Sequence, residues 1–407
     1  MKKPLPPGGG LYILIGWVLC CAFQPVICFA VPAADTTHFR IELLSATAAG
    51  PVKIGVGADG KGPINIRLQW QILLNGVPGQ KGILPDVALT PGHPSTLRLP
   101  LKLPPGNDEA WLKVTCRYRA LTFVRLLPLR PWGGDPVIPP AGELTFADSN
   151  NTFTITAPNT LIQFDKQTGW LLHYEAGGVH LMTDTAGVQP ALWPAIPPRL
   201  QLFSTSTGTQ LVIVRAEYTL PETASLLHLS YTINAAGAML VGQILEPDTS
   251  QQVPDTVRLP TLPGFGMHWL LPPGLDTLTW FGPTETVPPA ETAGLAAADS
   301  APPAIFQTAL TYSRENTRSA VRWLTFTDHQ GTGLHITADS ALITATLSAV
   351  DDSISHTKRT LLNIGTAPSS TTTVRANRQY FYKVTPVLPP APAAPHPASP
   401  RIHQEKR

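Results

Sequence analysis

The sequence predicts an all-β protein built from two domains. Of its 407 residues, 44 are proline and 32 are glycine, a content that disfavours long helices and favours a turn-rich β architecture. From about His38 onward, short runs alternate between apolar and polar residues, which is the period of a half-buried strand. The length exceeds that of one typical domain, so two domains are the natural expectation.

The first thirty residues have the pattern of a secretory signal peptide. Lys2 and Lys3 precede an apolar run at residues 11–23, and Cys28-Phe29-Ala30 places the cleavage site before Val31. The run is too short for a membrane span, which needs about 20 residues. We therefore expect residues 1–30 to be removed, the mature chain to be periplasmic or extracellular, and no membrane span to remain. The alternative is an uncleaved N-terminal anchor.

Residues 38–135 are predicted to form a β-sandwich. Residues 64–72, 95–103 and 110–118 alternate with period 2, so each is expected to be a strand with one buried face. Asn75-Gly76 follows the first of these runs, and this dipeptide favours a tight hairpin turn because both residues tolerate positive φ. Strands at this spacing, separated by glycine and proline, are typical of a sandwich of about 100 residues.

A larger β domain is predicted over residues 143–388. It follows a linker that begins at Trp132-Gly133-Gly134. Within it, residues 161–174 read as a strand, a turn at 166–169 and a second strand, and similar runs recur up to residue 384. Residues 389–407 are rich in proline and are expected to form a disordered tail.

Composition and motifs exclude several classes of function. Lys plus Arg is 29 and Asp plus Glu is 27, so the net charge of +2 argues against a nucleic-acid partner. Three of the four cysteines lie in the signal segment and only Cys116 remains, so no intramolecular disulfide is expected. The sequence has no phosphate-binding loop, dinucleotide fingerprint or clustered metal-ligand motif, and we expect no cofactor and no metal. The histidines are scattered singly, and we assign them to packing or to the surface.

Tryptophan is the one residue type that points to a ligand. An indole face can pack against the C–H face of a sugar ring, so a tryptophan-rich exported β protein can bind carbohydrate. The competing explanation is core packing, which we expect for four tryptophans on alternating strands: Trp70, Trp111, Trp269 and Trp323.

Two longer stretches resemble a known family. Residues 262–286 contain Trp280-Phe281-Gly282-Pro283-Thr284-Glu285, and residues 312–333 contain Arg314-Glu315-Asn316 followed by Val321-Arg322-Trp323. These stretches resemble the C-terminal small-chain domain of β-galactosidases of glycoside hydrolase family 2. Residues 164–169 resemble the opening hairpin of that domain, and residues 70–76 with 82–84 resemble the sandwich domain that precedes it.

The resemblance implies a fold and a set of site residues. Residues 38–135 would be an immunoglobulin-like sandwich, and residues 143–388 a β supersandwich of galactose-mutarotase type. The residues at a ligand or partner face would be Trp280, Glu285, Arg314, Glu315, Asn316 and Arg322. The alternative for this motif is a structural loop with an internal Glu315–Arg322 pair.

The sequence also departs from the family in ways that bear on function. In the family, the catalytic carboxylates lie on a barrel that precedes these two domains, and here the signal segment leads straight into the sandwich, so we expect no catalytic residue in this chain. The acidic segment typical of the family is replaced by residues 190–199, and the segment that normally carries a substrate-site tryptophan is replaced by residues 363–371, which have none.

Three readings follow from these observations. The first is an exported non-catalytic small chain that binds galactoside-type carbohydrate or serves a separate β-galactosidase catalytic chain. The second is a structural envelope protein that has lost its ligand site. The third is an enzyme of mutarotase or epimerase type on the same fold, which would need a histidine and a carboxylate that converge in the groove of the sandwich, for example His268 with Glu285.

Overall fold

The computed structural model is all-β and describes most of the chain between residues 39 and 388. The predicted signal segment and the predicted C-terminal tail lie outside the described residues, as do Glu285, Arg314 and Glu315. The described ranges are 39–46, 51–60, 62–119, 121–134, 137–182, 187–193, 197–250, 264–283, 303–310, 316–339, 342–351, 358–365 and 377–388. Within these ranges the helical structure is a single 3₁₀ turn, Pro221–Thr223, and no helix is long and apolar enough to span a membrane.

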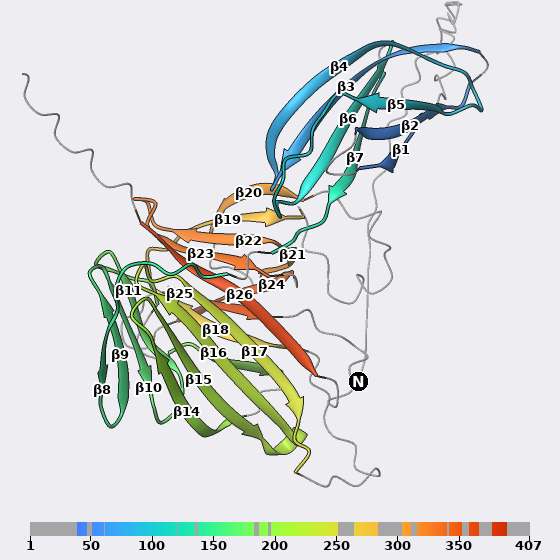
Figure 1. The fold of residues 1–407 in the computed structure, drawn as a ribbon. Helices are drawn as coiled ribbons and strands as arrows, with labels where there is room; N and C mark the ends of the chain where they lie inside the picture. The colour runs from blue at the N-terminus through green and yellow to red at the C-terminus, as the bar shows by residue number, and fades with distance from the viewer. Residues whose placement is uncertain are drawn as a thin grey trace, which may run out of the picture.

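The N-terminal strands form a seven-stranded sandwich (Figure 1), which we call the sandwich unit (residues 39–130). One sheet has the order β1-β2-β5 and the other β4-β3-β6-β7, a three-on-four arrangement of the immunoglobulin-like class. The strands are β1 (Phe39–Ser45), β2 (Val52–Ala58), β3 (Ile64–Leu74), β4 (Val77–Leu89), β5 (Ser95–Leu99), β6 (Ala110–Tyr118) and β7 (Leu121–Arg130).

The remaining strands form the large unit (residues 144–388). A nine-stranded sheet has the order β14-β15-β16-β17-β26-β23-β22-β19-β20, and two five-stranded sheets have the orders β12-β11-β10-β9-β8 and β13-β18-β25-β24-β21. The strands are β8 (Thr145–Asp148), β9 (Thr152–Ala157), β10 (Thr160–Asp165), β11 (Leu171–Ala176), β12 (Val179–His180), β13 (Gln189–Trp193), β14 (Arg199–Thr207), β15 (Leu211–Leu220), β16 (Ser225–Asn234), β17 (Met239–Pro247), β18 (Gly264–Leu271), β19 (Thr277–Gly282), β20 (Ala304–Ala309), β21 (Asn316–Val321), β22 (Trp323–Thr327), β23 (Gly333–Ala338), β24 (Ile343–Asp351), β25 (Lys358–Gly365) and β26 (Arg378–Val387).

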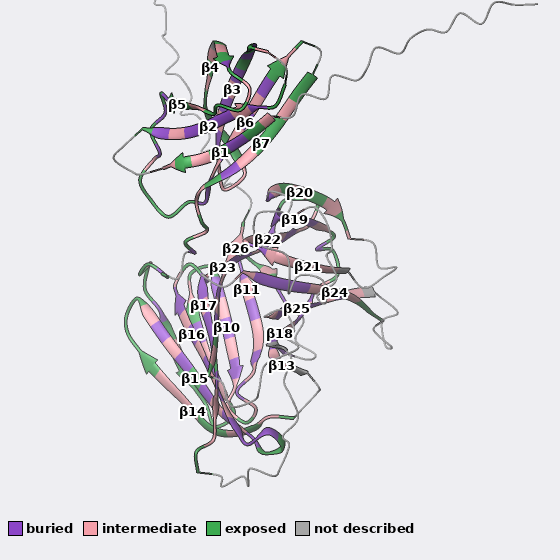
Figure 2. Cartoon of the chain, turned by 90° about the vertical axis from the view of Figure 1, so that its right-hand side faces the viewer, coloured by how far each residue is buried: buried purple, intermediate pink, exposed green. Residues whose placement is uncertain are grey.

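Each unit has its own hydrophobic core. Buried and partly exposed residues alternate along most strands (Figure 2), as the period-2 sequence pattern predicts. In the large unit, side chains from all three sheets meet in one core. There, the Trp269 indole donates a hydrogen bond to the Tyr382 hydroxyl at 3.1 Å, so its polar atom is satisfied inside the core. The all-β prediction is confirmed, and the domain limits drawn from the sequence stay predictions.

Both predicted hairpin turns are confirmed, and one predicted strand is shorter than expected. Asn75 and Gly76 have φ of 47° and 82° and join β3 to β4 in a two-residue turn. The turn at residues 166–169 joins β10 to β11, and the Asp165 carboxylate accepts hydrogen bonds within it. The strand expected over residues 95–103 ends at Leu99, because Pro100 has no N–H to donate to a neighbouring strand.

The segment predicted as a linker lies against the large unit. The Trp132 indole donates to the backbone oxygen of Asp339 at 2.9 Å. Further along, the Asn234 side chain donates to the Pro139 carbonyl and the Ala235 N–H donates to the Ala141 carbonyl. The connection between the units is therefore held by hydrogen bonds at several points along its length.

Candidate functional site

The two units meet through an ion pair between Glu109 and Arg322. The guanidinium donates from Nη2 to Glu109 Oε1 at 2.7 Å and from Nε to Oε2 at 2.8 Å, and its Nη1 donates to the Ala320 carbonyl at 2.8 Å. The side chains are 3% and 12% exposed for Glu109 and Arg322 respectively. This two-point geometry fixes both the distance and the orientation of the partners.

Arg322 reaches the sandwich unit because the chain changes sheets at this residue. Strand β21 belongs to a five-stranded sheet and β22 to the nine-stranded sheet, and Ala320 at the corner has φ of 56°. The Arg322 N–H donates to the Phe281 carbonyl, and its own carbonyl accepts from the Ala338 N–H. The Val321-Arg322-Trp323 motif thus places a buried aliphatic side chain, an ion-pair partner and an indole on three successive positions.

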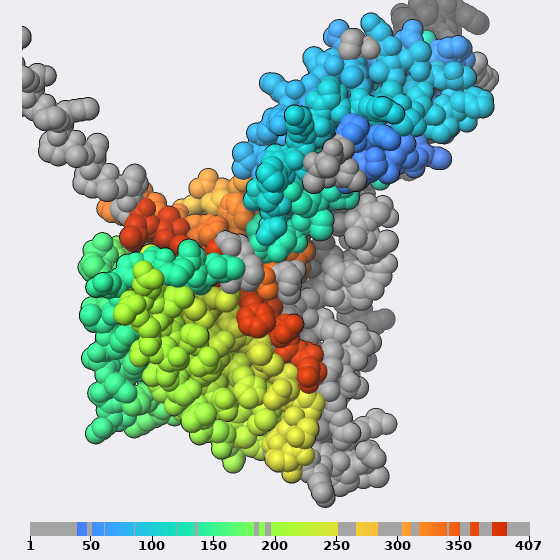
Figure 3. All heavy atoms as spheres, in the orientation of Figure 1, coloured from blue at the N-terminus to red at the C-terminus, as the bar shows by residue number. Residues whose placement is uncertain are grey.

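On the sandwich side, the hairpin turn between β3 and β4 holds Glu109 in place. The Asn75 side-chain oxygen accepts from the Glu109 N–H, the Asn75 N–H donates to the Glu109 carbonyl, and the Asn75 amide donates to Asp108 at 2.7 Å. At Gly76, an added Cβ would lie 2.8 Å from Cε2 of Phe281, so glycine is required for the close approach as well as for the turn. Figure 3 shows atoms of the sandwich unit meeting those of the C-terminal strands at this junction.

Beside this junction lies a cavity of about 450 Å³, which we call the interdomain groove. Its lining combines two indoles, a carboxylate, two amides and a lysine with smaller polar groups. The lining residues are Asn75, Asn107, Asp108, Trp132, Gly134, Trp323, His335, Thr337, Lys383 and Thr385. Pockets that bind small polar molecules commonly join apolar walls to a few placed polar groups, and this groove has both.

The two indoles that line the groove also contact Phe281, which lies at the interface between the two units. The ring centroids of Trp132 and Trp323 lie 6.5 Å and 6.2 Å from that of Phe281. Trp323 also contacts the His335 imidazole, with ring centroids 5.4 Å apart. Trp111 and Trp323, which the sequence assigns to the core, are partly exposed, and Trp323 lines the groove. Trp70 and Trp269 are buried as predicted.

His335 is a neutral hydrogen-bonding residue in this groove at ordinary pH. Its Nδ1 lies 2.7 Å from the Thr325 hydroxyl. Burial, with a smaller contribution from the charge of Lys383, lowers the pKa of His335 to about 4.

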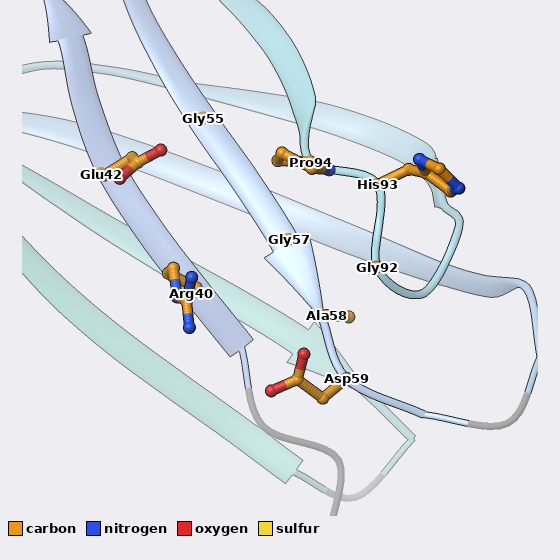
Figure 4. Close-up of a pocket in the computed structure, with 9 residues that line it drawn as sticks. All are labelled: Arg40, Glu42, Gly55, Gly57, Ala58, Asp59, Gly92, His93 and Pro94. Carbon is orange, nitrogen blue, oxygen red and sulfur yellow. The ribbon is translucent and has the colours of Figure 1, made fainter.

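A second, smaller cavity of about 110 Å³ lies on the sandwich unit (Figure 4). Arg40 and Glu42 of β1 line it, together with backbone positions of β2, Asp59 and His93. Its lining residues include charged groups but no tryptophan, tyrosine or phenylalanine. The interdomain groove is therefore the better candidate for an organic ligand.

The site residues predicted from the sequence are only partly brought together. Trp280 is 5% exposed and packs between Phe306 and the Arg318 guanidinium, which lies 4.1 Å from the indole centroid, so it contributes to the core. Arg322 pairs with Glu109, a partner that the sequence motif does not indicate. Asn316 begins β21, and Glu285, Arg314 and Glu315 lie outside the described residues.

Part of the chain matches a known family model. Residues 199–376 match the family model described as "Beta galactosidase small chain". A β-galactosidase of Priestia megaterium is 25% identical over 265 residues, which is 58% of this chain and 24% of that protein. The chain thus spans about a quarter of the length of this curated relative.

Two matching solved structures have low TM-scores. A putative mutarotase from Salmonella typhimurium has a TM-score of 0.38 at 10% identity, covering 61% of this chain and 96% of that one. A galactose 1-epimerase from Lactobacillus acidophilus has a TM-score of 0.34 at 8% identity, covering 60% of this chain and 98% of that one.

Removing either partner of the Glu109–Arg322 pair should destabilise the chain strongly. Arg322→Met or Glu109→Gln leaves an uncompensated buried group, and we expect each to lower the free energy of unfolding by about 3–5 kcal/mol. Urea unfolding measures this, with Lys166→Met as the control, because the Lys166–Asp148 pair is exposed and should contribute no more than about 1 kcal/mol. Equal small losses in all three variants would contradict the account of the interface.

His335 should make the folded chain less stable as the pH falls from about 6.5 to about 4. Because its folded pKa is lowered to about 4 and the unfolded value is about 6.5, the unfolded chain binds the extra proton in this window. The decrease in the free energy of unfolding should reach at most about 3 kcal/mol and should be complete near pH 4.

The measurement is urea unfolding at a series of pH values for the unmodified chain and for His335→Gln. His329→Gln is the control, because His329 lies in an exposed turn. The free energy of unfolding of His335→Gln should depend less on pH than that of the unmodified chain or of His329→Gln. If His335→Gln shows the same pH dependence of the free energy of unfolding as the unmodified chain, His335 is not the group that causes the loss of stability.

Proposed function

We propose that this chain, which carries a β-galactosidase small-chain-like domain, is an exported, non-catalytic protein that binds galactoside-type carbohydrate in the interdomain groove. In this role it acts alone or as the accessory chain of a separate β-galactosidase catalytic chain. The observation that carries the proposal is the juxtaposition of Trp132 and Trp323 with Asp108, Asn107 and Asn75 around one cavity.

The groove has the two kinds of group that a sugar needs. Each indole presents a flat apolar face for the C–H face of a pyranose ring. The Asp108 carboxylate and the amides of Asn75 and Asn107 can accept or donate hydrogen bonds with the hydroxyl groups around the ring. Because Asp108 is charged, its hydrogen bonds to hydroxyls are the stronger kind.

The same groove is poorly equipped for hydrolysis. Glycoside hydrolysis uses two carboxyl groups, which in retaining enzymes lie about 5–5.5 Å apart. Among the lining residues, Asp108 is the one carboxylate. The neighbouring Glu109 is buried and has both oxygens bound to Arg322. The groove therefore supports binding without cleavage.

Export rests on the sequence of the first thirty residues. The lysine pair, the apolar run and the Cys28-Phe29-Ala30 site support cleavage before Val31. The intact mass of the protein recovered from its host should correspond to a chain that starts near Val31, and a mass that includes residues 1–30 would contradict cleavage.

Galactoside binding should depend on Asp108. We expect methyl β-galactoside to bind in calorimetric titration and Asp108→Asn to weaken binding by roughly tenfold or more, since a hydrogen bond to a charged group contributes about 1.5–3 kcal/mol. The control is Asp59→Asn, which changes an acidic residue in the smaller cavity on the sandwich unit and should leave binding unchanged.

Three outcomes would contradict the proposal or a part of it. Absence of galactoside binding, or equal binding by Asp108→Asn and the unmodified chain, would remove the groove as the sugar site and favour a structural role. Turnover of a chromogenic galactoside by the chain alone would contradict the non-catalytic part. Turnover only on addition of a catalytic chain would support the accessory role.

A further inference from the structure

A second polar cluster lies on the five-stranded sheet β12-β11-β10-β9-β8 of the large unit, and none of its residues lines the groove. His173 and Glu175 are on β11 and His180 is on β12, the edge strand of its five-stranded sheet. Their neighbours on β11, Leu171, Tyr174 and Ala176, are buried. His173 and Glu175 alternate with Tyr174 and Ala176, so they share the opposite face of the strand.

The local sequence determines how these three side chains meet. Gly177 and Gly178 have φ of 61° and 76°, which are the two positive values of a type I′ hairpin turn. This turn pairs Ala176 with Val179 and places Glu175 directly opposite His180. A two-residue spacing on one strand and a cross-strand pair thus bring three ligand-type side chains to one point.

The distances are close to those of a metal site. His173 Nε2 lies 3.4 Å and His180 Nδ1 lies 3.9 Å from Glu175 Oε2, and the three ligand atoms lie within 4.8 Å of one another. Tetrahedral zinc with bonds of about 2.0–2.1 Å separates its ligand atoms by roughly 3.3–3.4 Å. Small rotations of the His180 ring, whose side chain is 59% exposed, would close the remaining gap.

A comparable cluster on the nine-stranded sheet lacks this geometry. His228 lies between two carboxylates, with Nδ1 3.9 Å from Glu217 and Nε2 3.1 Å from Glu246. The carboxylates approach opposite nitrogens of one ring, so one ion cannot bind all three side chains. The second cluster therefore provides a matched control in the same chain.

We propose that His173, Glu175 and His180 bind a divalent transition metal, with Zn²⁺ as the preferred ion. Two imidazoles and one carboxylate form a ligand set that suits zinc, and solvent fills the fourth position on the exposed side of the cluster. The bound ion ties edge strand β12 to β11 across the face of the sheet.

The test is calorimetric titration of the chelator-treated, full chain with Zn²⁺. We expect one saturable site per chain. His180→Ala and Glu175→Gln should each weaken it by roughly 10–100-fold or more, since loss of a ligand costs at least as much as loss of its supporting contacts. His228→Ala should leave the affinity unchanged.

A second readout separates binding at this site from loss of structure. Co²⁺ added to the unmodified chain should give the visible absorption of a tetrahedral nitrogen–oxygen site, and His180→Ala should abolish it while the β-type circular dichroism spectrum is retained. The proposal is overturned if no saturable site is found, or if His180→Ala and Glu175→Gln bind Zn²⁺ as tightly as the unmodified chain.

Discussion

The Glu109–Arg322 pair is the constraint on which the arrangement of the two units depends. Burying two charges is unfavourable unless they meet each other in good geometry, and here both carboxylate oxygens accept from one guanidinium. The pair therefore tolerates few relative positions of the units. The Asn75 turn supports Glu109 from one side and the corner at Ala320 supports Arg322 from the other, so local backbone features of both units converge on one contact.

The interdomain groove is a consequence of that contact. Asn75, Asn107 and Asp108 come from the sandwich unit, whereas Trp323, His335 and Lys383 come from the large unit. Trp132 joins them from the connecting segment, which is hydrogen-bonded to Asp339. The carboxylate and the two amides come from the sandwich unit, whereas the two indoles do not, so the proposed carbohydrate site exists only while the units are docked.

Features set by neighbouring residues could be predicted from the sequence, and those set by distant residues could not. The period-2 runs at residues 64–72 and 110–118 and the Asn75-Gly76 turn are local, and these predictions are confirmed. The partner of Arg322 lies 213 positions away, and nothing in the sequence links the two residues. Trp280 and Trp323 are both strand tryptophans, yet the first is buried and the second lines the groove, because sheet packing decides which face is covered. The sequence analysis did not predict the cluster of His173, Glu175 and His180. The available signal was the glycine pair between Glu175 and His180, which specifies a tight hairpin turn.

Hydrogen–deuterium exchange with and without methyl β-galactoside tests most directly whether the ligand site is shared between the two units. If the docked units form the site, the sugar should slow exchange simultaneously in peptides from both units. These peptides cover residues 75 and 107–109 of the sandwich unit and residues 323–337 and 383–385 of the large unit. Protection confined to one unit, or located away from these segments, would contradict the claim that docking of the units creates the site.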